Sequence, residues 1–501
     1  MQISHTLRYI PCLFSLILCS SIGATVGKTF FHDQSQRTHA YLYLLGLNYD
    51  FFHYNSCSWH GKFDAIAFYS HTRREKELGE FIFFNNTNTM KFGKQGAPDT
   101  DIFARNFFLN DDFEGGVTTE PSIENFVTHF YIHFGFDTFI ENLYLRIHMP
   151  VTWTQWQVNL SQCITTTGIA IAAETFGNED AASSPLGSII NAWKGNKLDP
   201  CEFPDLEKNM HFATINGKQS REKIADISFM LGYDIVRRPH KHLTLFAEAI
   251  FPTGTRVTAQ FLFEPIVGSG RHIQLGAGIR GFHDLWSDGV YRKLLIFFDA
   301  RIAHFFSSTQ RRTFDLHNNG IGSRYLLFKR FNQQTGMYAG EILFGPNVTS
   351  RISKVDIAAE GELTGMLQYR RHKTYIDVGG NLWARSKEKI KITELVPNNT
   401  FGIQGNTTTI DNNTAHNTHI DGSNAEPDPT PVFLKIEDFN LNSAEHPFAT
   451  TGLVFIHLSR NWTYHPNTPY LGIGGDLAFS LDENNSPYRW EIWVKTGFTF
   501  G

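Results

Sequence analysis

The sequence has no long apolar run beyond its N-terminal segment. No later stretch approaches the roughly 20 consecutive apolar residues that a membrane-spanning helix needs. The mean hydropathy is only -0.25, although 14% of the residues are aromatic and 41 are glycine. These values exclude a helical membrane protein with many spans. Aromatic residues and glycines distributed among polar residues favour short β-strands joined by turns.

An excess of positive charge is also missing. The chain carries 44 Lys and Arg against 49 Asp and Glu, a formal net charge of -5. Because nucleic-acid binding leaves a basic footprint, the sequence predicts no nucleic-acid partner.

Cysteine is scarce: there are five, and Cys12 and Cys19 belong to the N-terminal segment. Of the other three, Cys163 and Cys201 could form a disulfide in an oxidising compartment and leave Cys57 free. The residues alone do not decide whether that bridge forms.

Sequence signatures of catalysis are absent too. We find no Gly-x-Ser-x-Gly elbow, no phosphate-binding loop and no His-Glu-x-x-His motif. His240 and His242 could be two metal ligands on one strand face, but no third ligand follows at a recognisable spacing, and a surface pair beside a turn is the favoured interpretation. The prediction is therefore a protein that is not an enzyme and that has no metal site and no cofactor.

The N-terminus has the layout of a secretory signal peptide. Arg8 precedes an apolar run from Tyr9 to Leu18, and small residues follow as far as Ala24. Residues 1–24 are predicted to be the signal peptide, with cleavage after Ala24. A signal anchor or a buried helix is the alternative, although the apolar run is short for a membrane span.

Alternation of apolar and polar residues recurs along most of the chain. In the stretch DIAAEGELTGMLQYR (356–370), the odd-numbered positions are mostly apolar and the even-numbered ones mostly polar. The pattern resumes after the short break RHK, which predicts two strands joined as a hairpin. Further strands are predicted at 41–52, 57–71, 142–149, 224–236, 242–251, 272–280, 293–306, 451–464, 470–481 and 489–500.

A soluble sandwich and a membrane barrel both produce such alternation, and four features favour the barrel. The alternating runs reach about ten residues, the length that a tilted membrane strand needs. Short turns alternate with long loops, and the chain ends on a strand. Aromatic residues gather at strand ends, among them Trp153, Trp156, Trp286 and Tyr291, as interfacial girdles would. Residues 25–501 are predicted to form one all-β, transmembrane antiparallel β-barrel of roughly 12–16 strands.

Two long segments interrupt the strands. Residues 160–222 are irregular and contain SPLGSIINAWKG, which predicts a short helix, so this segment is our candidate for a loop that folds inward as a plug. Residues 393–447 are rich in Asn and Thr, a composition that predicts an exposed, mobile loop.

The paired acids Glu360 and Glu362 suit a catalytic pair less well than one hydrated face of a strand. In a barrel, that face meets the lumen, and charges of both signs there would set the selectivity of a pore. The predicted pore-lining residues are Glu248, Arg280, Asp299, Arg301, Asp356, Glu360, Glu362, Asp377, Arg385 and Lys495.

The last strand, RWEIWVKTGFTFG, resembles the final strand of Gram-negative outer-membrane β-barrels, whose terminal aromatic residue is read by the barrel assembly machinery. Here Gly501 follows Phe500, a departure from that pattern. Segments such as HLTLFAEAIFPTGTR (242–256) and HPFATTGLVFIHLSRNW (446–462) are similar to uncharacterised predicted outer-membrane proteins of intracellular bacterial lineages. The resemblance implies an architecture more than an activity.

The predicted function is a porin-like outer-membrane channel that passes small solutes down their gradients, with membrane lipid, solutes and the assembly machinery as partners. One alternative is a surface barrel without an open pore that serves adhesion or shielding through residues 393–447. Another is a secreted, soluble β-sandwich binding protein. The solute and the oligomeric state are left open.

Overall fold

The computed structural model describes residues 27–46, 60–83, 87–107, 109–168, 188–195, 205–405, 415, 418–423, 432–462, 468–482 and 485–500. The predicted signal peptide, Cys57 and Cys201 lie outside these residues. Within them, no helix is long and apolar enough to cross a membrane.

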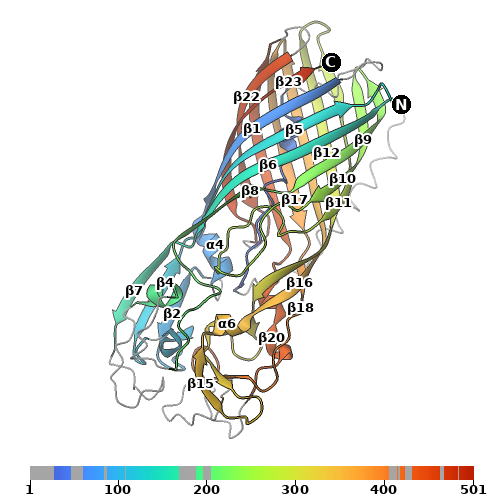
Figure 1. The fold of residues 1–501 in the computed structure, drawn as a ribbon. Coiled ribbons are helices and arrows are strands. Elements are labelled where there is room, and N and C mark those ends of the chain that lie inside the picture. Colours follow the sequence, from blue (N-terminus) through green and yellow to red (C-terminus); the bar gives the residue numbers. More distant parts are fainter. Residues whose placement is uncertain are drawn as a thin grey trace, which may run out of the picture.

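Twelve antiparallel strands form a closed barrel, in which each strand pairs with its neighbours in chain order (Figure 1). The first strand and the last close the ring, with Gly61 opposite Phe500 and Arg73 opposite Tyr488. The barrel strands are β1 (His60–Arg73), β5 (Ser122–Gly135), β6 (Leu143–Gln157), β9 (Ile227–Arg238), β10 (Lys241–Phe251), β11 (Gln274–Ser287), β12 (Arg292–Thr313), β16 (Ser350–Arg371), β17 (Thr374–Arg385), β21 (Ala449–Asn461), β22 (Thr468–Ser480) and β23 (Tyr488–Phe500). The predicted all-β barrel is confirmed, and a β-sandwich is excluded.

The outer face of the barrel is apolar and the inner face is polar. Exposed large apolar side chains recur at every second position of the strands, for example Val454, Ile456 and Leu458 on β21. The residues between them are buried, and many are polar or charged. In a soluble protein the apolar side chains face inward, so this arrangement is the reverse. It requires apolar surroundings outside the barrel, which a membrane provides.

The two ends of the barrel differ. Short turns join β5 to β6, β9 to β10, β11 to β12, β16 to β17 and β21 to β22 at one end, where β23 also ends (Figure 1). At the other end four connections exceed thirty residues, and they fold into an assembly that we call the outer assembly. In outer-membrane barrels the short turns are periplasmic and the long loops extracellular.

The outer assembly contains short elements around its own apolar core, which includes Phe92, Trp193 and Phe328. The sheet β3-β2-β4-β7 forms one part, and the sheet β15-β14-β19 another. Its elements are α4 (Glu75–Ile82), β2 (Thr89–Gly93), β3 (Ile102–Phe103), η1 (Ala104–Phe107), β4 (Glu114–Thr119), β7 (Leu160–Thr166), α5 (Ile189–Trp193), β8 (Lys218–Ile224), β13 (Asp315–Leu316), η3 (Ser323–Tyr325), β14 (Phe328–Phe331), β15 (Tyr338–Leu343), α6 (Gly345–Thr349), β18 (Glu388–Ile392), β19 (Phe401–Ile403), η4 (Ile436–Asp438), β20 (Phe439–Asn440) and α7 (Leu441–Ala444).

A break in register divides the strand β16. Ala303 of β12 pairs with Glu360, but Phe305 pairs with Ile357, so β16 carries one extra residue between these pairs. An extra residue reverses which side chains face inward, because successive residues of a strand point to opposite faces. Glu360 and Glu362 are therefore buried, whereas Asp356 is exposed.

Three predictions about individual segments are wrong in the described residues. Where the strand predicted at 41–52 is described, residues 41–44 form the short helix α2 (Tyr41–Leu44), which is fully buried, and residues 47–52 lie outside the described residues. Trp156 does not belong to an exposed girdle, because it is 1% exposed and packs in the core of the outer assembly. The Asn/Thr-rich segment contributes Phe401 and Phe439 to that core, since a few apolar residues can dock onto a core that other loops build.

The segment 160–222 lies outside the barrel lumen where it is described. Its strand β7 pairs with β4 in the outer assembly. Its strand β8 pairs with residues 151–157 of β6, at the end of that strand nearest the outer assembly. The short helix predicted in SPLGSIINAWKG is confirmed as α5. Cys163 is exposed on β7, and its predicted partner lies outside the described residues.

Candidate functional site: the lumen and the segment inside it

The lumen of the barrel is occupied by residues 28–46, which we call the lumen segment. Every one of these residues is buried. The segment starts at the outer assembly, where the Lys28 N–H donates to the carbonyl of Phe81 over 3.1 Å. It ends near the short turns, where the Gly46 N–H donates to Asp377 over 2.7 Å. It therefore runs along the inside of the barrel from the outer end towards the periplasmic end.

The lumen segment is mostly irregular, so its backbone polar groups need partners other than helix or sheet bonds. Tight local turns satisfy some of them, such as the Thr38 N–H that donates to the Ser35 carbonyl over 2.9 Å. The inward-facing side chains of the barrel satisfy many others. The segment has no alternation, and its surroundings change along its length: polar side chains of the wall surround much of it, whereas residues 41–45 pack against apolar wall residues such as Phe68 and Phe455.

Arg37 is the central charge of the lumen segment. Its guanidinium lies 3.0 Å from Glu360 and 3.7 Å from Glu248, and it donates to Gln274 over 3.2 Å. Arg301 pairs with Glu248 and Glu362 beside it. The two arginines and three glutamates alternate in sign, an arrangement that lowers the free energy of burying each charge.

Backbone groups of the lumen segment bind to wall charges at three further places. Glu362 accepts a hydrogen bond from the Ala40 N–H over 2.8 Å. Arg385 donates to the carbonyls of His32 and Asp33 over 2.6 and 3.2 Å. At each place a charged side chain of the barrel replaces the water that the peptide group would otherwise bind.

The ammonium group of Lys495 binds the end of helix α2. It donates to the carbonyls of Leu42, Tyr43 and Leu45 over 2.7, 3.2 and 2.8 Å. The last carbonyls of a helix have no partner within the helix, and a lysine has three donors. Lys495 thus satisfies three buried carbonyls.

Tyr41 and Tyr43 of α2 reach opposite parts of the wall. The Tyr41 hydroxyl donates to Asp476 of β22. The ring of Tyr43 faces the guanidinium of Arg146 at 4.2 Å and that of Arg280 at 5.3 Å, and Arg280 pairs with Asp299. The attraction between a cation and the face of an aromatic ring is stronger when both are removed from water.

The structure brings nine of the ten predicted pore-lining residues together around the lumen segment. All nine side chains lie inside the barrel, and each contacts the lumen segment or a residue that does. They are Glu248, Arg280, Asp299, Arg301, Glu360, Glu362, Asp377, Arg385 and Lys495. The tenth, Asp356, lies outside the lumen, because the extra residue in β16 turns it to the opposite face.

Sequence reasoning missed the lumen segment and its outer attachment. Arg489 of β23 lies 3.0 Å from Asp33, and Glu388 of β18 binds both His32 at 2.8 Å and Arg312 at 2.9 Å. Burial opposes ionisation of Glu388, but Arg312 and His32 outweigh it and hold the pKa of this carboxyl well below its usual range. The signal in the sequence was a polar, non-alternating stretch directly after the predicted signal peptide.

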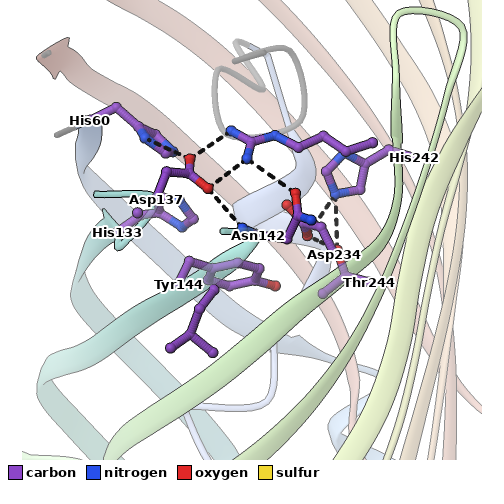
Figure 2. A pocket seen from close by; sticks show the side chains of 11 residues that line it. His60, His133, Asp137, Asn142, Tyr144, Asp234, His242 and Thr244 are labelled. Carbon is purple, nitrogen blue, oxygen red and sulfur yellow. Dashed lines mark hydrogen bonds and ion pairs between the residues drawn. The ribbon is translucent and has the colours of Figure 1, made fainter. Parts of the chain in front are cut away.

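A small cavity lies at the short-turn end of the lumen (Figure 2). Asp137, in the turn after β5, accepts hydrogen bonds from Arg237 over 2.8 and 2.9 Å and from the Asn142 N–H over 2.8 Å. Burial opposes ionisation of Asp137, but Arg237 and the Asn142 N–H outweigh it and lower the pKa of the carboxyl. The second acid, Asp234, binds His242 over 2.8 Å.

The cavity suits neither a metal nor a catalytic triad. One nitrogen of His242, Nε2, contacts both Asp234 and Thr244, whereas a triad needs the two ring nitrogens for the two partners. His240, the other predicted candidate ligand, points instead to Asp284, and its side chain is 73% exposed. In the part of the chain that the structure describes, no group of three or more His, Cys, Asp or Glu residues could hold a metal ion.

No family model and no curated protein matches the chain. Solved outer-membrane channels resemble it in fold. An outer membrane channel from Pseudomonas putida F1 has 9% identity and a TM-score of 0.32, over 88% of this chain and 96% of that one. The CymD monoaromatic hydrocarbon channel has 10% identity and a TM-score of 0.27, over 89% and 88%. A FadL homologue of Pseudomonas aeruginosa has 6% identity and a TM-score of 0.27, over 88% and 89%.

At TM-scores this low the neighbours do not decide a function, and the environment follows from the barrel itself. Its closed ring, apolar outer face and polar interior are those of an outer-membrane β-barrel. The chain is accordingly an outer-membrane protein.

Proposed function

We propose that this barrel is a channel for small solutes whose lumen is closed by its own N-terminal segment. The observation that carries the proposal is the polar attachment of residues 32–40 and of the end of α2 to charged side chains of the wall. Only residues 41–45 pack inside the lumen on an apolar cluster of wall residues, which includes Phe68 and Phe455. Apolar packing of the same volume often stabilises as well as a buried ion pair or better. A polar interface is, however, one that water can replace when the segment moves.

Once the lumen segment is displaced, the same wall charges would border a water-filled path. Charges of both signs would line the path, since Glu360 and Glu362 lie close to Arg301. Rings or rows of charge select ions and polar solutes by sign and hydration. The proposed substrates are therefore small polar solutes that pass down their gradients without a cofactor or a catalytic step.

Single-channel recording in planar bilayers tests this function. The mature chain is expected to be closed for most of the time, and a variant without residues 28–46 to conduct steadily. A milder variant, Glu362→Gln with Asp377→Asn, weakens two attachment points without removing a segment. It should open more often than the parent.

Asp356→Asn is the matched control, because it removes an acid that is exposed outside the lumen. Its open probability should equal that of the parent. A deletion variant that inserts correctly but never conducts would overturn the channel proposal.

A second candidate, a non-conducting surface barrel for adhesion or shielding, is favoured by the outer assembly. That assembly has its own apolar core, to which residues 401–403 and 434–444 of the Asn/Thr-rich segment contribute. Two results together would favour this candidate. The deletion variant would show no conductance in bilayers, and a variant with a shortened outer assembly would no longer bind to cell surfaces.

The end of the chain supports a proposed route of assembly. β23 runs to Phe500 at the short-turn end, as expected for a strand that the barrel assembly machinery reads. Phe500→Ala should then lower the amount of folded barrel in the outer membrane. The narrower similarity to proteins of intracellular bacterial lineages stays a prediction.

A further inference from the structure

Three arginines form a row on the outer face of the barrel at its short-turn end. Arg292 of β12 lies directly opposite Arg371 of β16, Arg371 lies opposite Thr374 of β17, and Thr374 lies opposite Arg460 of β21. All three arginines are exposed. We call Arg292, Arg371 and Arg460 the arginine row.

The row has little counter-charge of its own. Arg292 has one partner, Asp288, at 4.0 Å. Among the described residues, Arg371 and Arg460 form no ion pair, nor does Lys373 in the adjacent turn. The sequence that joins β21 to β22 contains no acidic residue either. Like charges directly opposite each other destabilise a sheet, so an arrangement of this kind calls for an external anion.

The surface next to the row is apolar and faces lipid. The neighbouring outward-facing positions on the same four strands are Leu294, Tyr369, Ile376 and Leu458, followed by Ile296, Leu367, Val378 and Ile456. On the other side of the row, exposed Val290 and Tyr291 lie in the turn between β11 and β12, and the Tyr291 ring stacks on His372 at 4.2 Å. Val290, Tyr291 and His372 border an open hollow, which the arginine row also lines.

We propose that this surface binds the phosphate headgroup of an anionic phospholipid in the periplasmic leaflet. The guanidinium groups match phosphate oxygens in geometry and charge. The apolar rows would contact the acyl chains. Tyr291 lies at the depth where aromatic rings meet headgroups in membrane proteins. The site is separate from the lumen and does not depend on the proposed channel function.

The test uses the full mature chain in detergent and measures its unfolding temperature by the shift between folded and unfolded bands on a gel. Dioleoylphosphatidylglycerol should raise this temperature at concentrations at which dioleoylphosphatidylcholine does not. In the triple variant Arg292→Gln, Arg371→Gln, Arg460→Gln, the concentration of phosphatidylglycerol needed should rise on the order of 100-fold, because each cation near an anionic lipid surface is worth about fivefold. The difference should also shrink with added salt.

Two further variants keep the result interpretable. Arg238→Gln with Lys241→Gln removes the same kind of charge from the same rim but outside the row, and should respond as the parent does. Arg371→Glu gives Arg292 a cross-strand partner of opposite sign. This variant should be at least as stable as the parent in phosphatidylcholine and should still lose the response to phosphatidylglycerol.

Three outcomes would overturn the proposal. The first is an equal response of the parent to the two lipids. The second is a triple variant that responds within threefold of the parent. The third is full protection by inorganic phosphate or by deacylated glycerophosphoglycerol, which would identify a soluble phosphate, not a lipid, as the ligand.

Discussion

Arg37 of the lumen segment and Glu360 of the barrel wall form an ion pair of 3.0 Å, and both side chains are almost completely buried. One partner belongs to the segment that fills the lumen, and the other to a strand that forms the barrel. The stability of this contact therefore bears directly on whether the lumen is closed.

Replacing Arg37 by alanine should detach the middle of the lumen segment. The change leaves Glu360 buried without its ion-pair partner, whereas Glu248 keeps its contact with Arg301. Breaking a buried ion pair by removing one partner typically costs about 3–5 kcal/mol. Amide hydrogen exchange of residues 35–40 should accelerate strongly, while the barrel strands keep their protection. Asp356→Asn should change stability by less than about 0.5 kcal/mol, because its side chain is exposed. Unchanged exchange in the arginine variant would show that Arg37 does not hold the segment.

Replacing Lys495 by methionine should free the periplasmic end of the segment. Three carbonyls would lose their hydrogen bonds, and each buried unsatisfied group costs about 1–3 kcal/mol. Exchange should rise at residues 42–46. The converse variant, Arg489→Gln, removes the partner of Asp33 and should raise exchange at residues 33–35 instead. Identical exchange patterns in the two variants would argue against separate attachment points.

Asp226, between β8 and β9, should make the protein less stable as the pH rises. Burial raises the pKa of this carboxyl to about 6, although the Ser269 N–H donates to it over 2.7 Å. A raised pKa in the folded state contributes stability that is complete below the unfolded value near 3.8 and is lost as the pH rises through about 6.

The variant Asp226→Asn should therefore gain up to about 3 kcal/mol over the parent at pH 8 and almost nothing at pH 4. Denaturant midpoints at the two pH values measure the difference. An advantage that is larger at pH 4 than at pH 8 would contradict the assignment.

Asp137, at the cavity near the short turns, should behave in the opposite way. Its pKa is lowered, so its contribution to stability is present above the unfolded value and is lost as the pH falls through the folded value. Arg237→Gln should remove this acid dependence and cost about 1–3 kcal/mol at neutral pH, because it breaks hydrogen bonds between charged groups. Denaturant unfolding between pH 7 and pH 3 measures the stability of both proteins. An equal loss of stability with acid in the parent and in the variant would refute this role of Asp137.

The sequence predicts the barrel well because alternation is a local property of each strand. The strands β10 and β23 begin and end within one residue of the predicted positions 242–251 and 489–500. The inward face is equally predictable wherever the alternation continues unbroken, and this is why nine of the ten predicted lumen charges lie inside.

The failures arise from contacts between distant parts of the chain. The extra residue in β16 depends on the register with β12, which no local pattern reveals, and it places Asp356 outside the lumen. Residues 28–46 were not identified as the segment in the lumen, because the partners of Arg37 and Ala40 lie more than 200 residues away along the chain. Phe401 and Phe439 are buried only because other loops provide a core.

The covalent connection between the lumen segment and β1 limits how far the segment can travel. Thirteen residues, 47–59, separate Gly46 from His60. Even a fully extended connection of that length spans only roughly 50 Å. A displaced segment thus stays near the mouth of the barrel at an effective concentration on the order of millimolar. Reclosing is an intramolecular event, and its rate should not depend on protein concentration.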